Sequence, residues 1–386
     1  MEGGFLVGAM IVTRLKAANW RNFRKIDISL ENRVFAVGPN ASGKSNFLDI
    51  FAFLNALAKR GGGLFSAVEE RGGFSDLKCR AGDCDSFEIS VALGTEKQPE
   101  KWIYEIGVGC GSSIPFLRYE RVFCDGEKIL DRPEKADSED PVRLEQTFLE
   151  TGVLNSSFRE IAVFFSETVQ HSWSPTFSGG RSRRAGFSRI DIDDSAYPFF
   201  SELRAAPPEI RKNRIAKIER VLQLVLPQLK QLGYSKINES EIRLETVFDH
   251  WRPGEKLAQE HFSEGTLRLI SILWTLLASR SLLLLEEPEL SLHPSVVRYL
   301  PGLIYRMKRK EPGQTILTTH SPELLSDPGI DASEVILFLP EEEGVSVVSA
   351  ADVPEAKALI DAGLSIGEIV LPRSEPARIE ELGFFE

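Results

Sequence analysis

The segment GPNASGKS, at residues 38–45, constrains the fold of this 386-residue chain more than any other part of its sequence. It matches the pattern G-x-x-x-x-G-K-[ST] at every fixed position. The apolar run VFAV lies directly before it, and apolar residues recur at helical spacing from Phe47 to Leu57 after it. A strand, a glycine-rich turn and a helix in this order aim backbone N–H groups at a phosphate. The sequence therefore predicts an α/β nucleotide-binding fold rather than a simple surface turn.

This loop is expected to bind ATP together with Mg²⁺. Lys44 is expected to reach the β- and γ-phosphates, and the Ser45 hydroxyl is expected to bind the metal. The glycines let the backbone N–H groups turn inward around the phosphates. The predicted nucleotide-binding residues of this segment are Gly38, Pro39, Asn40, Ala41, Ser42, Gly43, Lys44, Ser45 and Asn46.

A second motif places carboxylates directly after a buried strand. Four leucines at residues 282–285 are followed by Glu286, Glu287, a proline and Glu289. Carboxylates beside a phosphate loop can hold Mg²⁺ and polarise the attacking water. We assign Glu286 to the metal and Glu287 to the water. A strand that merely ends in solvated acids is the alternative, and the phosphate loop elsewhere in the chain weighs against it.

Two further motifs have both a functional and a structural interpretation. His320 closes a strand at residues 315–319, where it could contact the γ-phosphate and sense its presence. A lone histidine is more often structural, but its place after the acidic strand favours function. Ser263 and Gly265 open a long apolar helix, and a helix start is a potential anion site. Ser263 could equally be a simple N-cap with Thr266 in the first turn, and taken alone this simpler interpretation is favoured.

Together these motifs resemble the ATP-binding-cassette heads of the SMC, RecF and overcoming-lysogenization-defect (OLD) group. They are most similar to the stand-alone AAA ATPases of bacterial antiphage defence loci. The resemblance covers about residues 10–125 and 240–370, and the segments GPNASGKSN, SEGTLRL, LLLLEEPELSLHP and TTHSPELL carry it. It implies catalytic roles for Lys44, Glu287 and His320. It also implies that Ser263 and Gly265 face the γ-phosphate of a second subunit, and that residues 291–294 lie at that seam.

The chain also departs from the pattern of this group. Glu286 stands where the metal-binding carboxylate is usually Asp, so the expected hydrolysis is slow. No Q-loop is identifiable, and Gln146 and Gln170 are the candidates. Residues 20–24, WRNFR, resemble the N-terminal segment that lies near the nucleotide in this group. No long heptad array interrupts the chain, and the fused nuclease of OLD proteins is expected to be absent.

The expected fold class is a two-lobed α/β ATPase head, with a mixed sheet, an antiparallel β-meander and a largely helical insertion. Within the insertion we expect a loop at 131–150 and a helix at about 158–169. A second helix at 209–231 is expected to end early at Pro227. The expected domains are an N-terminal extension (1–9), lobe I (10–125), the insertion with its Ser/Gly/Arg-rich loop (126–240), lobe II (241–350) and a C-terminal tail (351–386).

The composition limits the cellular environment and the binding partners that are expected for this chain. A net charge of −11 excludes a bulk cationic nucleic-acid coat. Nucleic acid remains a possible partner through arginines in the loop at 171–194 (Arg181, Arg183, Arg184 and Arg189) or basic residues on the helix at 209–231, although a solvated face explains both. Four cysteines at this chain length favour reduced thiols in the cytoplasm. The apolar stretch at 269–285 is better explained by a buried helix and strand than by a membrane span.

Three functions are compatible with these observations. The first is an ATPase that dimerises, or forms a higher oligomer, through its heads when ATP binds, and that gates a separate effector such as a nuclease or toxin in antiphage defence. The second is a RecF- or SMC-like DNA-repair ATPase that binds DNA directly. The third is an ATP-bound scaffold with little turnover. A transporter subunit is disfavoured because SEGTL stands in place of LSGGQ.

Overall fold

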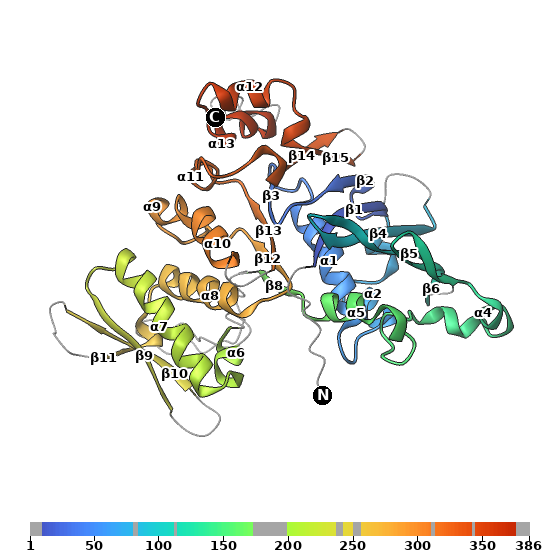
Figure 1. Cartoon of the computed structure of the whole chain (residues 1–386), viewed down its shortest axis with the longest axis horizontal. Coiled ribbons are helices and arrows are strands. Elements are labelled where there is room, and N and C mark those ends of the chain that lie inside the picture. Colours follow the sequence, from blue (N-terminus) through green and yellow to red (C-terminus); the bar gives the residue numbers. More distant parts are fainter. Residues whose placement is uncertain are drawn as a thin grey trace, which may run out of the picture.

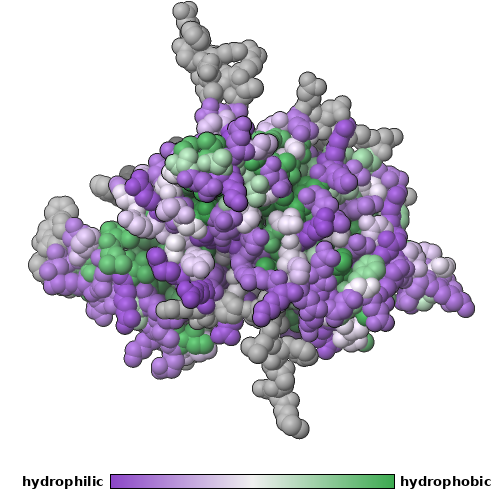
Figure 2. Space-filling view, turned by 45° about the horizontal axis from the view of Figure 1, so that its top comes forward, coloured by the Kyte–Doolittle hydropathy of each residue, from purple (hydrophilic) through white to green (hydrophobic). Residues whose placement is uncertain are grey.

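The computed structural model describes residues 10–79, 84–111, 114–172, 199–236, 242–249, 256–309, 313–341 and 344–375. Figure 1 shows a central sheet between two groups of elements. Strands β1, β4 and β5 lie on one side of it, and helices α8–α10 lie on the other. Figure 2 shows that hydrophilic residues cover most of one face of the molecule, with separate apolar patches. Within the described ranges, no helix is long and apolar enough to cross a bilayer.

The central sheet has the strand order β15-β14-β3-β13-β12-β8. Its strands are β3 (Arg33–Val37), β8 (Val169–Ser172), β12 (Leu282–Glu286), β13 (Gln314–Thr319), β14 (Val335–Glu341) and β15 (Gly344–Ser349). All neighbours pair in parallel except β14 and β15. Because the carboxyl ends of parallel strands meet at one edge, the phosphate loop, the acidic turn and His320 follow β3, β12 and β13 at the same edge.

The run of leucines in β12 is buried because both faces of the central sheet are covered. Leu282 and Leu284 belong to the core shared with α1, whereas Leu283 and Leu285 belong to the core shared with α8. Helix α1 (Lys44–Ala58) buries Phe47, Phe51 and Leu54 in the first core. At the other end of α1, the Asn55 side chain donates hydrogen bonds to the carbonyls of Phe165 and Thr168, at 2.7 and 3.2 Å. These bonds join the end of α1 to the residue before β8.

A second sheet of order β2-β1-β4-β5-β6-β7 packs against the other side of α1. Its strands are β1 (Ile11–Trp20), β2 (Phe23–Ser29), β4 (Ser86–Thr95), β5 (Gln98–Cys110), β6 (Pro115–Cys124) and β7 (Glu127–Arg132). Strands β4 to β7 form the expected meander, and a tight hairpin turn joins β6 to β7. Asp125 and Gly126 there have φ values of 50° and 81°, as a tight hairpin requires. Two short helices, α2 (Leu64–Glu69) and α3 (Phe74–Leu77), follow α1.

The middle of the chain departs from the sequence-based expectation. The expected loop at 131–150 contains α4 (Lys135–Glu139) and a 3₁₀ turn (Pro141–Glu145). Helix α5 (Arg159–Ser166) is shorter than expected, because the chain then forms β8 and joins the central sheet. The loop arginines predicted at 181–189 lie outside the described residues.

The rest of the insertion contains two helices, α6 (Phe199–Ala205) and α7 (Pro208–Val225), followed by β9 (Leu229–Lys236). Strands β10 (Ile242–Phe248) and β11 (Lys256–Ala258) come after residue 240, in the segment expected to begin lobe II. Helix α7 ends two residues before Pro227, as expected. Strands β9, β10 and β11 form one antiparallel sheet, so a domain boundary at residue 240 would divide it.

The last part of the chain completes the second core. The helices are α8 (Glu264–Ala278), α9 (Pro294–Val297), α10 (Leu300–Lys308), α11 (Pro322–Leu325), α12 (Ala356–Asp361) and α13 (Ile366–Val370). Residues Ile366, Ile369 and Val370 of α13 are buried in that core together with residues of α11. The expected C-terminal tail is therefore folded onto lobe II as far as the structure describes it.

Candidate functional site

The phosphate loop joins β3 to the start of α1 in the geometry that an anion requires. Gly43 lies immediately before the first helical residue and has a φ of 98°, in the left-handed region. A Cβ atom at Gly43 would lie 2.4 Å from the Asn22 side chain. No side chain caps this helix start, so the N–H groups of its first turn are left for a ligand.

Lys44 lies inside the loop rather than in solvent. Its Nζ donates to the carbonyl oxygens of Gly38 and Pro39 at 2.8 and 2.9 Å, and the residue is 6% exposed. Burial lowers the pKa of Lys44, and the nearby carboxylates of Glu287, Glu289 and Glu286 oppose this shift. The loop thus holds a buried cation beside the acidic turn, at the position where a phosphate is expected.

Ser45 and Glu286 form the contact between the start of α1 and the end of β12. The Ser45 hydroxyl donates to a carboxylate oxygen of Glu286. A hydroxyl and a carboxylate are hard oxygen ligands of the kind that Mg²⁺ prefers. The longer Glu side chain therefore does reach Ser45, and the two residues fit the metal site predicted from them.

Glu287 and His320 lie together at the open edge of the sheet. His320 Nδ1 is 3.3 Å from Glu287 Oε1, and the two side chains are 46% and 26% exposed. Glu287 has a φ of 44°, which is unusual for a non-glycine residue. Its backbone N–H is held by Thr318, at 3.2 Å from the carbonyl oxygen and 3.1 Å from Oγ1. The structure thus brings together the residues predicted to orient water and to sense the γ-phosphate.

The start of α8 shows the simpler of its two predicted roles. Ser263 is the N-cap, and its Oγ accepts a hydrogen bond from the N–H of Thr266 at 3.2 Å. A Cβ atom at Gly265 would lie 2.4 Å from the carbonyl oxygen of Ser291, so this close approach requires glycine. Ser291 also donates to Glu264 at 2.8 Å. The start of α8 is therefore fastened to the segment after the acidic turn, and contact with a second subunit stays a prediction.

The comparisons with known proteins agree with this geometry. Residues 37–326 match the family model described as "AAA domain, putative AbiEii toxin, Type IV TA system". The chain belongs to this family. No curated protein matches its sequence.

Solved structures show that the fold of this AAA-domain protein is that of an SMC head. An Smc head bound to the C-winged helix domain of ScpA has a TM-score of 0.55 at 15% identity, over 91% of this chain and 99% of that one. A second Smc head, with an extended coiled coil and bound to the C-terminal domain of ScpA from Pyrococcus furiosus, has a TM-score of 0.53 at 13% identity, over 92% and 98%. The AAA-domain protein is therefore built as a P-loop, ABC-type ATPase head.

Asn22 is a residue of the AAA domain's site that sequence reasoning did not single out. It lies in the β1–β2 turn, where its Oδ1 accepts from Asn46 Nδ2 at 2.7 Å, and its Nδ2 donates to the Ser42 carbonyl at 3.4 Å. Trp20 Nε1 also donates to the Asn46 carbonyl at 3.0 Å. The resemblance of residues 20–24 placed this segment near the nucleotide, but only the fold shows that Asn22 supports the phosphate loop.

The two Q-loop candidates lie in different places in the AAA domain. Gln170 is on β8, where it pairs with Leu284, two residues before the end of β12. Gln146 lies away from that sheet, and its carbonyl accepts a hydrogen bond from Arg132 at 2.8 Å. Gln170 is therefore the candidate that neighbours the acidic strand.

Proposed function

We propose that this AAA-domain protein binds Mg-ATP, hydrolyses it slowly, dimerises through its heads and gates a separate effector, such as a nuclease or toxin, in antiphage defence in the cytoplasm. One observation carries the proposal. Lys44, the Ser45–Glu286 pair and the Glu287–His320 pair lie at one edge of the central sheet. The family description, which names a toxin of a type IV system, supports the link to an effector.

In this proposal each group acts on a different part of ATP. The N–H groups at the start of α1 and Lys44 bind the phosphates, and they are already held in place by the loop. Ser45 and Glu286 hold Mg²⁺, which when bound neutralises phosphate charge. Glu287 orients the attacking water, because its carboxylate lies at the open edge beside His320. His320 contacts the γ-phosphate and thereby couples its presence to Glu287.

The dimer is supported by an exposed helix start that the protein's own site does not use. Ser263 and Glu264 at the start of α8, and Ser291 beside them, are exposed. In a dimer of two facing heads, this surface of one copy would place the start of α8 against the γ-phosphate bound by the other copy. Hydrolysis then removes the phosphate that joins the heads and resets the effector.

Mass photometry of the wild type and Glu287→Gln, with and without Mg-ATP, tests this function. Glu287→Gln is expected to accumulate a dimer or larger species with Mg-ATP, because it binds ATP without hydrolysing it. Lys44→Ala is the matched control and is expected to stay at the mass of the nucleotide-free protein. If Glu287→Gln changes neither turnover nor assembly, the ATP-bound scaffold replaces this proposal.

Direct binding of nucleic acid is the second candidate, and helix α7 supports it. Lys212, Lys217 and Arg220 are exposed on α7, and none of them forms an ion pair within the described parts of the chain. We expect duplex DNA to bind with an affinity that falls as salt rises, and Ala at all three positions to weaken it. Fluorescence anisotropy measures this, and DNA-stimulated hydrolysis would favour the DNA-repair alternative.

A further inference from the structure

Glu289 is the one carboxylate of the acidic turn without a role in the function proposed above. It is 7% exposed, and its Oε1 accepts a hydrogen bond from Thr319 Oγ1 at 2.6 Å. Its Oε2 is buried and has no hydrogen-bond partner among the residues that the structure describes. Burying a carboxylate is costly unless its oxygens are paired. Burial of Glu289 therefore has a free-energy cost that packing of the fold alone does not explain.

The bond to Thr319 is part of a double connection between the acidic turn and the end of β13. The Thr319 Oγ1 also accepts from the N–H of Ser321 at 3.0 Å. Glu287 is tied to Thr318 through its backbone N–H, at 3.1 and 3.2 Å. His320 thus lies between two residues, Thr319 and Ser321, that are linked to the Glu289 carboxylate.

We propose that Glu289 is a positioning residue of the switch, which holds the end of β13 through Thr319 so that His320 meets Glu287. The inference rests on the proposed ATPase function and deepens it. Without this link the end of β13 would lose its side-chain connection to the acidic turn, and the His320 imidazole would no longer be held 3.3 Å from the Glu287 carboxylate. Glu289 itself touches neither water nor nucleotide in this account.

The charged groups near Glu289 include Lys44 of the phosphate loop, and His320 also lies near it. Burial raises the pKa of Glu289, and the hydrogen bond from Thr319 and the charge of His320 oppose this shift. The same carboxylate opposes the lowering of the Lys44 pKa by burial. Glu289 therefore lies close enough to both the phosphate-binding cation and the switch histidine to influence each of them.

Two matched pairs of variants test the role of Glu289. Glu289→Gln keeps a hydrogen-bond acceptor for Thr319, whereas Glu289→Leu removes it. Thr319→Ser keeps the donor on the other side of the same bond, whereas Thr319→Val removes it. We expect Gln and Ser to retain kcat within about threefold, and Leu and Val to lower kcat about 10- to 100-fold with KM for ATP little changed.

A double-variant cycle separates positioning from general loss of structure. If Glu289 acts through His320, Glu289→Leu combined with His320→Ala has the same kcat as His320→Ala alone. The proposal would be overturned if the double variant lost kcat by the product of the two single losses. Full activity of Glu289→Leu alone would also overturn it. Melting temperatures identify any variant that fails to fold, and the Thr319 pair then decides, because it breaks the same bond from the other side.

A measurement without turnover keeps this inference separate from the ATPase proposal. The chain has five histidines, so the ring resonance of His320 can be assigned in NMR spectra by its loss in His320→Ala. We expect this resonance to move in Glu289→Leu and Thr319→Val but not in Glu289→Gln or Thr319→Ser. If the wild type hydrolyses no ATP, the ATPase function fails while this positioning is still tested. If the resonance is unchanged in all four variants, the positioning role fails.

Discussion

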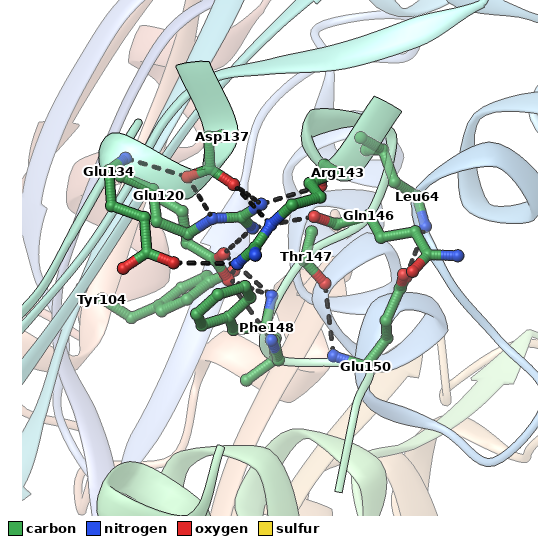
Figure 3. A network of polar contacts seen from close by, with 12 residues as sticks. Leu64, Tyr104, Glu120, Glu134, Asp137, Arg143, Gln146, Thr147, Phe148 and Glu150 are labelled. Atoms are coloured by element: carbon green, nitrogen blue, oxygen red, sulfur yellow. Dashed lines mark hydrogen bonds and ion pairs between the residues drawn. The ribbon is translucent and has the colours of Figure 1, made fainter. Parts of the chain in front are cut away.

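Two clusters in this molecule each place a buried cation beside carboxylates, but they differ in how completely their polar atoms are paired. In the cluster of Arg132, Glu120 and Asp137, every side-chain N and O of these three residues has a partner. Figure 3 labels the two carboxylates, Glu120 and Asp137, among the polar contacts of this network. Arg132 bonds to Asp137 at 3.0 and 3.1 Å and to Glu120 at 3.0 Å. It also donates to the carbonyls of Arg143 and Gln146 at 2.7 and 2.8 Å. These three side chains are fully buried.

The cluster at the phosphate loop is incompletely paired. Lys44 bonds only to backbone carbonyls, Glu289 keeps one buried oxygen without a partner in the described residues, and Glu287 has a strained backbone. Fully paired networks hold a structure together, whereas incomplete ones persist at functional sites where a ligand completes them. The comparison predicts that variants of the first cluster lose stability and variants of the second lose activity.

The largest expected effect is on catalysis at the incompletely paired cluster. Glu287→Gln should lower kcat for ATP hydrolysis by about 10²- to 10⁴-fold, as expected for the loss of a general base. Its free energy of unfolding should change by less than about 1 kcal/mol, because Glu287 is partly exposed. Steady-state phosphate release and urea unfolding measure the two quantities. Glu139→Gln, an exposed carboxylate on α4, is the control and should change neither.

Arg132→Met should have the opposite profile. It leaves Glu120 and Asp137 buried without their cation, which typically costs about 3–5 kcal/mol of folding free energy. The turnover of the molecules that remain folded should be unchanged, because Arg132 does not contribute to the phosphate site. Urea unfolding and kcat normalised to the folded fraction test this. A stable variant with reduced kcat would remove the distinction between the two clusters.

Gly43→Ala should affect both properties at once. Its φ of 98° disfavours any side chain, and the added Cβ meets Asn22 at 2.4 Å. Strain of this kind costs about 1–3 kcal/mol, and it lies in the loop that receives the phosphates. We expect weaker ATP binding in calorimetry together with a lower melting temperature. Gly126→Ala, also at positive φ but with open space around its Cβ, should lower only the melting temperature.

The smallest expected effect is a pH dependence beside the Arg132 cluster. The Glu150 carboxylate accepts a hydrogen bond from the N–H of Leu64 at 2.8 Å, and the Glu150 backbone N–H donates to Thr147 Oγ1 at 3.2 Å. Burial nevertheless raises the pKa of Glu150 to about 7. The folded protein therefore holds a proton there that the unfolded chain releases near its usual pKa of 4.5. Stability from this group is present at low pH and declines as pH rises from about 4.5 to 7.

Urea unfolding across this pH range tests the Glu150 effect. Glu150→Gln keeps an acceptor for Leu64 but cannot ionise, so its unfolding free energy should decline less with rising pH than that of the wild type. Glu139→Gln should retain the wild-type slope. An identical slope in Glu150→Gln would show that other groups set the pH dependence.

The parts of the fold that the sequence predicted are those with strong local patterns. The phosphate loop, the leucine strand and the meander each carry their signal within a few neighbouring residues. Strand β8 escaped prediction because its four residues, VQHS, have no periodicity, and pairing with β12 determines its conformation. The helix at 135–139 was read as loop because its capping box pairs Glu134 with Asp137 instead of the usual Ser or Thr with Glu, and because the buried Arg132 network helps to order the segment.

The residues of the candidate site likewise fall into those that local motifs predict and those that they do not. Lys44, Ser45, Glu286, Glu287 and His320 follow recognisable motifs, and the structure brings them together. The individual roles of Asn22 and Glu289 were not predicted, because their contacts cross between motifs: Glu289 meets Thr319 thirty residues later in the chain. No pattern within one segment indicates such a pairing. The catalytic roles of Lys44, Glu287 and His320 and the metal-binding roles of Ser45 and Glu286 remain predictions.

The hydrogen bonds made by Asn55 connect the last turn of helix α1 to the chain that leads into β8. Its 15 residues form a rod about 22 Å long, with Lys44 at one end and Asn55 in its last turn. The Asn55 side chain donates a hydrogen bond to the carbonyl of Thr168. The next residue begins β8, which pairs with β12. Helix α1 therefore connects the phosphate loop, at its first residue, with the strand at the edge of the central sheet, at its last turn.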